Sequence, residues 1–318
     1  MNRIKVFLPI LISAFFIYLA VCNLSLHQII QSFSTIKWGW IGLSFLFTVF
    51  GFIVRVIRWR FFFLNSPSYY SLTSSFLIGL TVNNLLPARI GELVRAYILK
   101  KREDVSVSLA FGTILLERVF DGLSVFLFLA ILLFVCPFPS KVKTMGFIIT
   151  GIYLLTLIFF ILLKTHKDFV LKKMAFSQKL ALVVSEFAGG LSILGSFRQV
   201  LIISVYSIIA WVIYGFCLYF CLFGFSLNLP IYVGFFVLVM AVIGVMIPAA
   251  PGYLGTYQYF CILALALFNV PQNIAFSYSM VAYIISFVPV TIFGIVFLFL
   301  EGLSFEKLLS LKDDKIHP

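Results

Sequence analysis

The sequence predicts an all-α membrane protein whose helices cross the bilayer several times. Of its 318 residues, 63% are hydrophobic and only 11% are charged, and the mean hydropathy is +1.15. A soluble globular domain carries roughly 25% charged residues, so a soluble fold is excluded. Apolar runs of about 20 residues, the length that spans a bilayer as a helix, recur along the chain. These runs are continuous, whereas the strands of a membrane β-barrel alternate apolar and polar residues.

About six spanning helices follow from these runs, within a single integral membrane domain over residues 1–318. The second helix ends in Arg55, Arg58 and Arg60, which mark its cytoplasmic end. Lysines punctuate residues 164–199 and predict a cytoplasmic amphipathic connector on the inner leaflet, and residues 301–318 form a cytoplasmic tail. The spans are expected near residues 6–21, 41–57, 107–135, 145–163, 200–223 and 274–300.

The basic residues determine the orientation. The formal net charge is +12, and lysine and arginine gather in cytoplasmic loops of membrane proteins. All 23 basic residues fall on the predicted inside except Lys37, Lys141 and Lys143, which lie outside, and Arg118, which lies within a span. We therefore expect a multi-pass protein of the bacterial inner (plasma) membrane with both termini in the cytoplasm. No basic soluble domain is present to bind nucleic acid, so we expect no nucleic-acid partner.

The five cysteines do not predict a metal site. Cys217 and Cys221 are one helical turn apart, but no histidine lies nearby. Cysteines in apolar runs are typical small packing residues. We expect neither a metal nor a cofactor.

A polar stretch, residues 83–97, lies between the second and third spans and carries two arginines, a glutamate and two asparagines. The apolar arm before it, residues 72–86, is short for a full span, and both flanks are basic. A helical hairpin that enters from the cytoplasmic side and turns near Pro87 and Gly91 satisfies both facts. Non-helical backbone inside a membrane is tolerated where protein or a wet cavity covers it. The alternative is a cytoplasmic loop whose basic residues meet lipid headgroups.

A second pair of apolar arms, residues 233–247 and 259–268, flanks another proline- and glycine-rich break. Both breaks read Pro-Ala-x-x-Gly-x-Leu, and each is followed by Val-x-x-x-Leu/Ile-Ala-Phe at the start of a long helix. The second hairpin opens to the outside, so residues 41–135 and 200–300 form an inverted repeat, which in transporters builds a midplane site. Chance similarity and a plain loop are the alternatives. The predicted hinges are Pro87, Gly91, Pro248, Pro251, Gly252 and Gly255.

Charged side chains are concentrated in the first repeat. A charge within the bilayer is costly, so such residues usually face the interior and act there. The planar fork of arginine suits phosphate. The alternative is a structural lock between arginine and carboxylates. The predicted substrate-binding residues are Asn83, Asn84, Arg89, Glu92, Arg95, Glu117, Arg118 and Asp121, and Thr256, Tyr257 and Gln258 would line the site from the second repeat.

Three motifs resemble a known family. They are Asn-Asn-Leu-Leu-Pro-Ala-Arg-Ile-Gly-Glu-Leu-Val-Arg at 83–95, Glu-Arg-Val-Phe-Asp-Gly-Leu at 117–123 and Pro-x-x-Pro-Gly-x-Leu-Gly at 248–255. Together they resemble the lysylphosphatidylglycerol synthase transmembrane region, also called the flippase-like domain or UPF0104 family, over nearly the whole chain. The resemblance implies an inner-membrane protein with lipid translocation as its role. Larger members add an aminoacyl-transferase or glycosyltransferase domain, which this stand-alone chain lacks. Members often have glutamate where this chain has Gln258, so no proton role carries over to that position.

We therefore expect a flippase, a transporter that moves a lipid with an anionic headgroup, such as a phospholipid or polyprenyl phosphate, between leaflets. The arginines would hold the phosphate, and the carboxylates would pair with them when the site is empty. A membrane enzyme that acts on a lipid headgroup is a second class. Neither a metal-binding cluster nor a Gly-x-Ser-x-Gly element is present, so we expect no enzyme. A non-enzymatic membrane partner of a cell-envelope lipid or glycan synthase is a third class.

Overall fold

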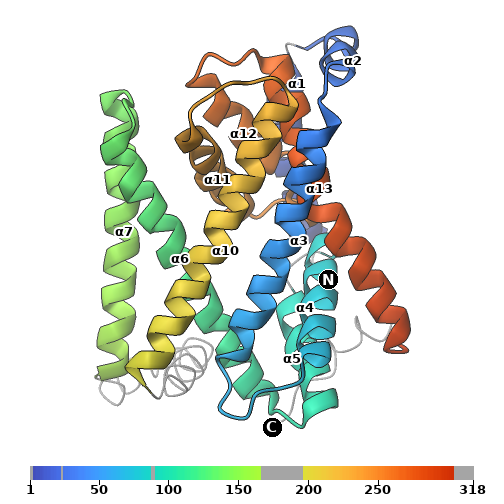
Figure 1. Ribbon diagram of the computed structural model, residues 1–318, viewed down its shortest axis with the longest axis vertical. Coiled ribbons are helices and arrows are strands. Elements are labelled where there is room, and N and C mark those ends of the chain that lie inside the picture. The colour runs from blue at the N-terminus through green and yellow to red at the C-terminus, as the bar shows by residue number, and fades with distance from the viewer. Residues whose placement is uncertain (1–2, 23, 87–89, 166–195, 304–318) are drawn as a thin grey trace. The chain divides into compact units, whose positions relative to one another are not determined.

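The computed structural model describes residues 3–22, 24–86, 90–165 and 196–303, and all regular structure in these ranges is helical (Figure 1). Most of the predicted connector at 164–199 and of the predicted tail at 301–318 lies outside the described residues. The elements are α1 (Arg3–Val21), α2 (Leu26–Ser34), α3 (Trp38–Arg60), α4 (Tyr69–Leu85), α5 (Gly91–Glu103), α6 (Val107–Val135), α7 (Ser140–Thr165), α10 (Phe197–Gly224), α11 (Ile231–Met246), the short 3-10 helix η2 (Pro251–Tyr253), α12 (Thr256–Ala266) and α13 (Gln272–Leu300).

Each predicted span coincides with a helix, and each predicted hairpin coincides with a pair, α4–α5 and α11–α12. Four of the described helices, α3, α6, α10 and α13, are long and apolar enough to cross a membrane. The bent pair α1–α2 counts as a fifth span if it is taken as one. The protein is thus a multi-pass, all-helical membrane protein, and the six spans and the inverted repeat stay predictions.

Helix α2 lies between the first two predicted spans, in a stretch for which the sequence predicted no helix. Ser25 accepts a hydrogen bond from the backbone of Gln28, and the Gln28 side chain accepts one from the backbone of Ser25. This reciprocal capping box satisfies two backbone donors that a helix start otherwise leaves open. A short helix held by its cap gives only a weak apolar signal in the sequence.

The chain folds as two compact units that alternate along the sequence. Unit 1 comprises Met1–Ile53, Ser74–Arg95 and Val212–Pro318, and unit 2 comprises Val54–Thr73 and Ala96–Trp211. Several helices, including α3 and α10, run from one unit into the other.

In unit 1 the two hairpins close on glycines. A Cβ added to Gly79 would lie 2.8 Å from the carbonyl oxygen of Gly91, so the backbones of α4 and α5 touch there. A Cβ added to Gly244 would lie 2.8 Å from the carbonyl oxygen of Thr256, so α11 and α12 touch in the same way. Helix α12 also packs against α1 and α13 (Figure 1). Close backbone approach of this kind requires glycine.

In unit 2 helix α6 packs against α7, and its inner face meets the end of α3. The rings of Phe62 and Phe120 meet edge to face, 6.0 Å apart, and the indole of Trp59 is fully buried. This apolar packing surrounds a set of charged side chains.

Candidate functional site

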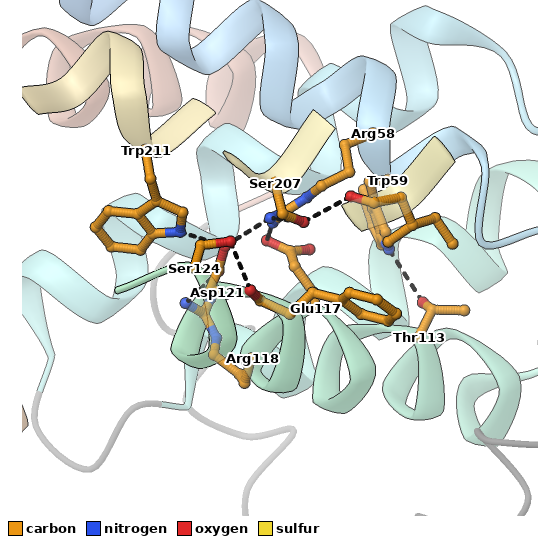
Figure 2. Close-up of polar contacts among 11 residues, drawn as sticks. Arg58, Trp59, Thr113, Glu117, Arg118, Asp121, Ser124, Ser207 and Trp211 are labelled. Carbon is orange, nitrogen blue, oxygen red and sulfur yellow. Dashed lines mark hydrogen bonds and ion pairs between the residues drawn. The ribbon is translucent and has the colours of Figure 1, made fainter. Parts of the chain in front are cut away.

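The most deeply buried charge in the described part of unit 2 is the guanidinium of Arg58, which is 0% exposed. Its Nη1 donates to Oδ1 of Asp121 at 2.5 Å and to Oγ of Ser207 at 3.0 Å. Its Nη2 lies 3.0 Å from Oε1 of Glu117. Figure 2 shows the arginine between these three partners. One side chain of α3 thereby connects α6 and α10.

Local helix geometry creates this arrangement. Glu117 and Asp121 are four residues apart on α6, so both carboxylates lie on one face. Ser207 and Trp211 are likewise four apart on α10, and the indole Nε1 of Trp211 donates to Oδ1 of Asp121 at 2.9 Å. The Asp121 carboxylate therefore receives donors from both α3 and α10.

The neighbouring tryptophan fixes α3 against α6. The indole Nε1 of Trp59 donates to Oγ1 of Thr113 at 3.0 Å (Figure 2). The Thr113 hydroxyl donates in turn to the carbonyl oxygen of Ala110 at 2.7 Å. Burying an ion pair costs desolvation energy that only good geometry and further hydrogen bonds offset. Here Nη1 of Arg58 and the Trp211 indole supply such hydrogen bonds, whereas Nε of Arg58 has no hydrogen-bond partner within the described residues.

Two further arginines lie at the edge of this cluster. Nη1 of Arg118 lies 3.7 Å from Oδ2 of Asp121, and the Arg118 side chain is 43% exposed. Cζ of Arg55 lies 4.9 Å from the centre of the Trp211 ring, and Arg55 is half-buried. We call Arg55, Arg58, Glu117, Arg118 and Asp121 the charge cluster. Of its three arginines, Arg118 is exposed, Arg55 is half-buried and Arg58 is fully buried.

Arg118 does not point towards the lipid-facing side of α6. Successive residues of an α-helix turn by about 100°, so Val125 and Leu129 lie on nearly the same side as Arg118. Both are only 6% exposed. Leu109 and Leu127 lie on the opposite side and are 39% and 44% exposed. The Arg118 side chain therefore leaves α6 on the side of the helix that carries the buried residues Val125 and Leu129.

An apolar groove of about 370 Å³ lies on the other side of α6, between α6, α7 and α10. Each of its four hydroxyl groups donates to a helix carbonyl oxygen at 2.8–3.1 Å. These hydroxyls belong to Ser124, Thr150, Tyr153 and Ser204. The lining of the groove is therefore mostly apolar.

The predicted site residues of the first hairpin belong to unit 1. Oδ1 of Asn83 accepts from the backbone N–H of Gly91 at 2.9 Å and so caps the start of α5. Nδ2 of Asn84 donates to Oγ1 of Thr291 on α13 at 3.0 Å. Both asparagines therefore hold the hairpin in place.

Two of the charged residues that were predicted in this hairpin, Glu92 and Arg95, lie within the described residues. Arg95 is 2% exposed, with Cζ 4.7 Å from the ring centre of Phe76, and Glu92 is half-buried. Pro87 and Arg89 lie outside the described residues. The geometry thus brings Glu117, Arg118 and Asp121 together, and it gives Arg95 an aromatic partner within unit 1.

The second hairpin break is built on two glycines in the left-handed region. Gly252 has φ 73° and Gly255 has φ 94°, conformations that side chains with a Cβ rarely adopt. Pro251 starts the short helix η2 at the break, five residues after α11 ends, with Pro248 between them. A Cβ on Gly252 would lie 2.6 Å from the hydroxyl oxygen of Tyr283 and 3.4 Å from the carbonyl oxygen of Asn84. The two predicted breaks therefore meet within unit 1.

The predicted lining residues of the second repeat are buried. Thr256, Tyr257 and Gln258 are 0–2% exposed. Oε1 of Gln258 accepts from the backbone N–H of Gly255 at 2.7 Å and so caps α12, while Tyr257 packs edge to face against Tyr283. Their observed contacts are those of packing and capping.

Sequence reasoning missed Arg58, Ser207 and Trp211. Arg58 does more than mark a cytoplasmic helix end, because it is fully buried and paired with both carboxylates of α6. The sequence did contain a signal for Arg58. The apolar helix α6 contains two carboxylates, Glu117 and Asp121, but only one arginine, Arg118, so a second cation from another helix is required. Within the described residues, no group of three or more His, Cys, Asp or Glu side chains could hold a metal ion.

Comparison with known proteins agrees with these motifs. A UPF0104 membrane protein of Methanocaldococcus jannaschii is 31% identical over 224 residues, which cover 69% of this chain and 93% of that protein. A second UPF0104 membrane protein of the same organism is 23% identical over 308 residues, covering 90% of this chain and 91% of that protein. The glycosyltransferase AglD of Haloferax volcanii is 41% identical over 54 residues, covering 17% of this chain and 9% of that protein. No solved structure matches.

The family described as the lysylphosphatidylglycerol synthase TM region matches residues 6–294. This range includes both hairpins and the whole charge cluster. The chain therefore belongs to the lysylphosphatidylglycerol synthase TM region family.

Proposed function

We propose that this protein moves a lipid with an anionic headgroup between the two membrane leaflets, and that it acts as a transporter rather than an enzyme. The observation that carries the proposal is the charge cluster, which lies in helices apolar enough to span a bilayer. Charges in such helices are rare and usually belong to a substrate pathway. Membership of a family named after a lipid synthase supports a lipid-related role.

The division of labour among the arginines supports an anionic cargo. Arg58 is fully buried by Glu117, Asp121 and Ser207, so it acts as the anchor that holds the carboxylates. Arg118 is 43% exposed and Arg55 is half-buried, so these two guanidiniums would meet the headgroup. Arginine forms paired, charge-assisted hydrogen bonds with phosphate oxygens.

The two hairpins would supply the movement. Each closes on a glycine that touches a backbone carbonyl of its partner helix, which supports a repeated hairpin unit. In the proposal Gly91, Gly252 and Gly255 absorb the bending. Asn83, Asn84, Arg89, Glu92 and Arg95 of the first hairpin would guide the headgroup.

Leaflet exchange in proteoliposomes tests the proposal. Vesicles carrying wild type, Arg118→Ala or the control Arg102→Ala are loaded with a fluorescent phosphatidylglycerol, and a membrane-impermeant quencher reports exchange. Arg102 lies outside the cluster, with Cζ 4.7 Å from the ring centre of Tyr70. We expect at least a tenfold loss of rate for Arg118→Ala, about 1.4 kcal/mol, and none for Arg102→Ala. Equal rates for wild type and Arg118→Ala would remove Arg118 from the mechanism.

A second candidate is a membrane partner of a glycan synthase. One specific observation favours it, the 54-residue similarity to a protein named as a glycosyltransferase. Copurification of such an enzyme, together with no exchange of any lipid in vesicles, would favour this alternative over transport.

A further inference from the structure

The first turn of α12, at the second hairpin break, contains a buried hydrogen-bond donor without an acceptor. Nε2 of Gln258 has no hydrogen-bond partner within the described part of the chain, and Gln258 is only 2% exposed. The other end of the same amide is fixed, because Oε1 accepts from the backbone N–H of Gly255 at 2.7 Å. The free NH2 group is therefore held beside the start of the helix. A buried donor left unpaired costs free energy, which an acceptor on a ligand would recover.

The backbone adds further donors at the same place. The N–H groups of Thr256, Tyr257 and Gln258 form the first turn of α12, where a helix provides no intrahelical acceptor. Gly255 precedes them and has no side chain that could cap them. None of the side chains in this turn is acidic. The aligned peptide dipoles give the start of a helix a partial positive charge, so this turn is suited to an anion.

The second helix of the first hairpin, α5, begins differently. Oδ1 of Asn83 accepts from the backbone N–H of Gly91 at the start of α5, and Glu92 places an acidic side chain in the first turn. The chain thus supplies its own acceptor and its own carboxylate there. Of these two hairpin helices, α12 is the one whose first turn carries donors without a carboxylate.

We propose that the first turn of α12 binds a phosphate oxyanion through the Gln258 amide and the backbone N–H groups, and that this oxyanion is the headgroup phosphate of the transported lipid. In transporters, the starts of half-helices at broken spans contact anionic substrate groups in this way. The inference rests on the proposed function and adds a second contact for the same headgroup, at a hinge rather than in the charge cluster.

Tyr283 supplies a further donor at the break. A Cβ on Gly252 would lie 2.6 Å from its hydroxyl oxygen, and its ring packs edge to face against Tyr257 with the ring centres 5.7 Å apart. Tyr283 is half-buried, whereas Gln258 is buried. A headgroup would therefore meet the hydroxyl first and reach the amide when Gly252 and Gly255 bend, so that binding is coupled to opening of the hinge.

Binding measurements on the full chain in detergent test this site without requiring transport. The probes are phosphatidylglycerol and a diacylglycerol with the same acyl chains, which lacks the phosphate, and native mass spectrometry reads both affinities. Gln258→Glu keeps an oxygen that can accept from Gly255 but replaces the donor by a second oxygen. We expect this variant to weaken phosphatidylglycerol binding about tenfold or more and to leave diacylglycerol binding unchanged.

Gln272→Glu is the matched control. Gln272 also begins a helix, α13, but its Nε2 already donates to the carbonyl oxygen of Ala20 at 3.1 Å. This variant should change neither affinity. Tyr283→Phe removes only a half-buried hydroxyl and should weaken phosphatidylglycerol binding about fivefold, so it tests the site even if Gln258→Glu fails to fold.

Two results would overturn the proposal and leave Gln258 as a helix cap only. One is a phosphatidylglycerol affinity that Gln258→Glu leaves unchanged or, where that variant does not fold, one that Tyr283→Phe leaves unchanged. The other is an equal loss of affinity for phosphatidylglycerol and diacylglycerol, since a phosphate contact cannot affect a lipid without phosphate.

Inorganic phosphate separates the two possible sources of the oxyanion. It should displace phosphatidylglycerol only at concentrations far above that of the lipid, and displacement at equal concentration would overturn the assignment to a lipid. The site and the proposed transport can also fail separately. An affinity that depends on Gln258 without leaflet exchange would refute transport and keep the site. Leaflet exchange that Arg118→Ala abolishes, together with a wild-type affinity in Gln258→Glu, would refute the site and keep transport.

Discussion

In unit 2 three helices meet at a buried arginine, whereas in unit 1 two hairpins meet at glycines and asparagines. Arg58 of unit 2 is held by two carboxylates and a hydroxyl, and the indole of Trp211 donates to one of these carboxylates. At the junction in unit 1, the groups that face Gly252 are the hydroxyl of Tyr283 and the backbone carbonyl of Asn84, and neither is charged.

The two units thus place polar groups among apolar helices in two different ways. A paired charge fixes its helices, because moving one partner leaves the other buried and uncompensated. A neutral junction of backbone groups and glycines can shift at a cost of one or two ordinary hydrogen bonds. We expect unit 2 to provide the rigid binding site and the breaks of unit 1 to provide the hinges.

The largest expected effect comes from removing the anchor. Arg58→Met leaves Glu117 and Asp121 buried together without their main cation, and breaking a buried pair costs about 3–5 kcal/mol. Unfolding in detergent, followed by temperature or denaturant, should show this loss. Arg60→Met on the same helix is the control, because Arg60 stacks on Tyr69 with Cζ 4.3 Å from the ring centre and should lose about 1 kcal/mol at most.

A similar small loss for both arginine variants would contradict the anchor role. A combined variant in which Arg58, Glu117 and Asp121 all become apolar separates pairing from packing. Replacing a whole buried ion set by apolar residues is often neutral or stabilising, so the combined variant should recover stability but not leaflet exchange of the lipid.

The next effect concerns the hairpin closures in unit 1. A Cβ on Gly79 would lie 2.8 Å from a backbone oxygen of α5, so Gly79→Ala must push the two helices apart. Overpacking of this kind costs about 1–3 kcal/mol. Gly42→Ala on α3 is the matched control, because no atom lies within 4 Å of its added Cβ. Alanine is also favoured over glycine in helices by about 1 kcal/mol, so Gly42→Ala should be neutral or stabilising.

The contrast between the units also explains what the sequence could predict. Apolar runs predicted the long helices, and Pro248 and Gly252 predicted the second break, because these signals are local to the chain. The spacing of Glu117 and Asp121, four residues apart in one apolar run, is also local and indicates that they share a helix face. The anchor could not be predicted in the same way, because the burial of Arg58 depends on partners more than 50 residues away in the chain.

For the first hairpin, the sequence locates the polar residues but does not reveal their role. Asn83 and Asn84 were predicted to bind substrate from their place beside a helix break, and that prediction stays untested. Their observed partners are the Gly91 N–H and the Thr291 hydroxyl. A helix end leaves backbone groups without intrahelical hydrogen bonds, so capping contacts of this kind are expected at any helix break. Residue type alone cannot separate capping from binding, because both use the same amide groups.

A smaller loss of stability is expected for a substitution at the uncharged junction of the two hairpins in unit 1. Asn84→Ala removes the 3.0 Å hydrogen bond to Thr291, and hydrogen bonds between membrane helices contribute about 0.6 kcal/mol on average. A double-mutant cycle with Thr291→Val, read by unfolding in detergent, isolates this contribution. A coupling energy above about 2 kcal/mol, beyond the range measured for such bonds, would show that the junction is as rigid as the charge cluster.

The smallest effect concerns a charge at the exposed end of unit 2. Ser68 donates to Oε1 of Glu103 from its hydroxyl at 2.6 Å and from its backbone N–H at 3.1 Å, and these bonds hold the pKa of Glu103 below its usual range. Because the folded-state pKa is lowered, the stabilisation is present above the usual glutamate pKa of about 4.3 and is lost as the pH falls through the folded-state pKa. Glu103→Gln should therefore lower stability at pH 7 by less than about 1 kcal/mol, because an exposed charge is screened by solvent. Stability measured from pH 7 to pH 3 should show the wild-type advantage shrinking towards the acid end. If the stability difference between wild type and Glu103→Gln grew on acidification, the role of the ionised carboxylate would be contradicted. If that difference were as large as the loss for Arg58→Met, exposed and buried charges would stabilise the protein equally, and the comparison of the two units would fail.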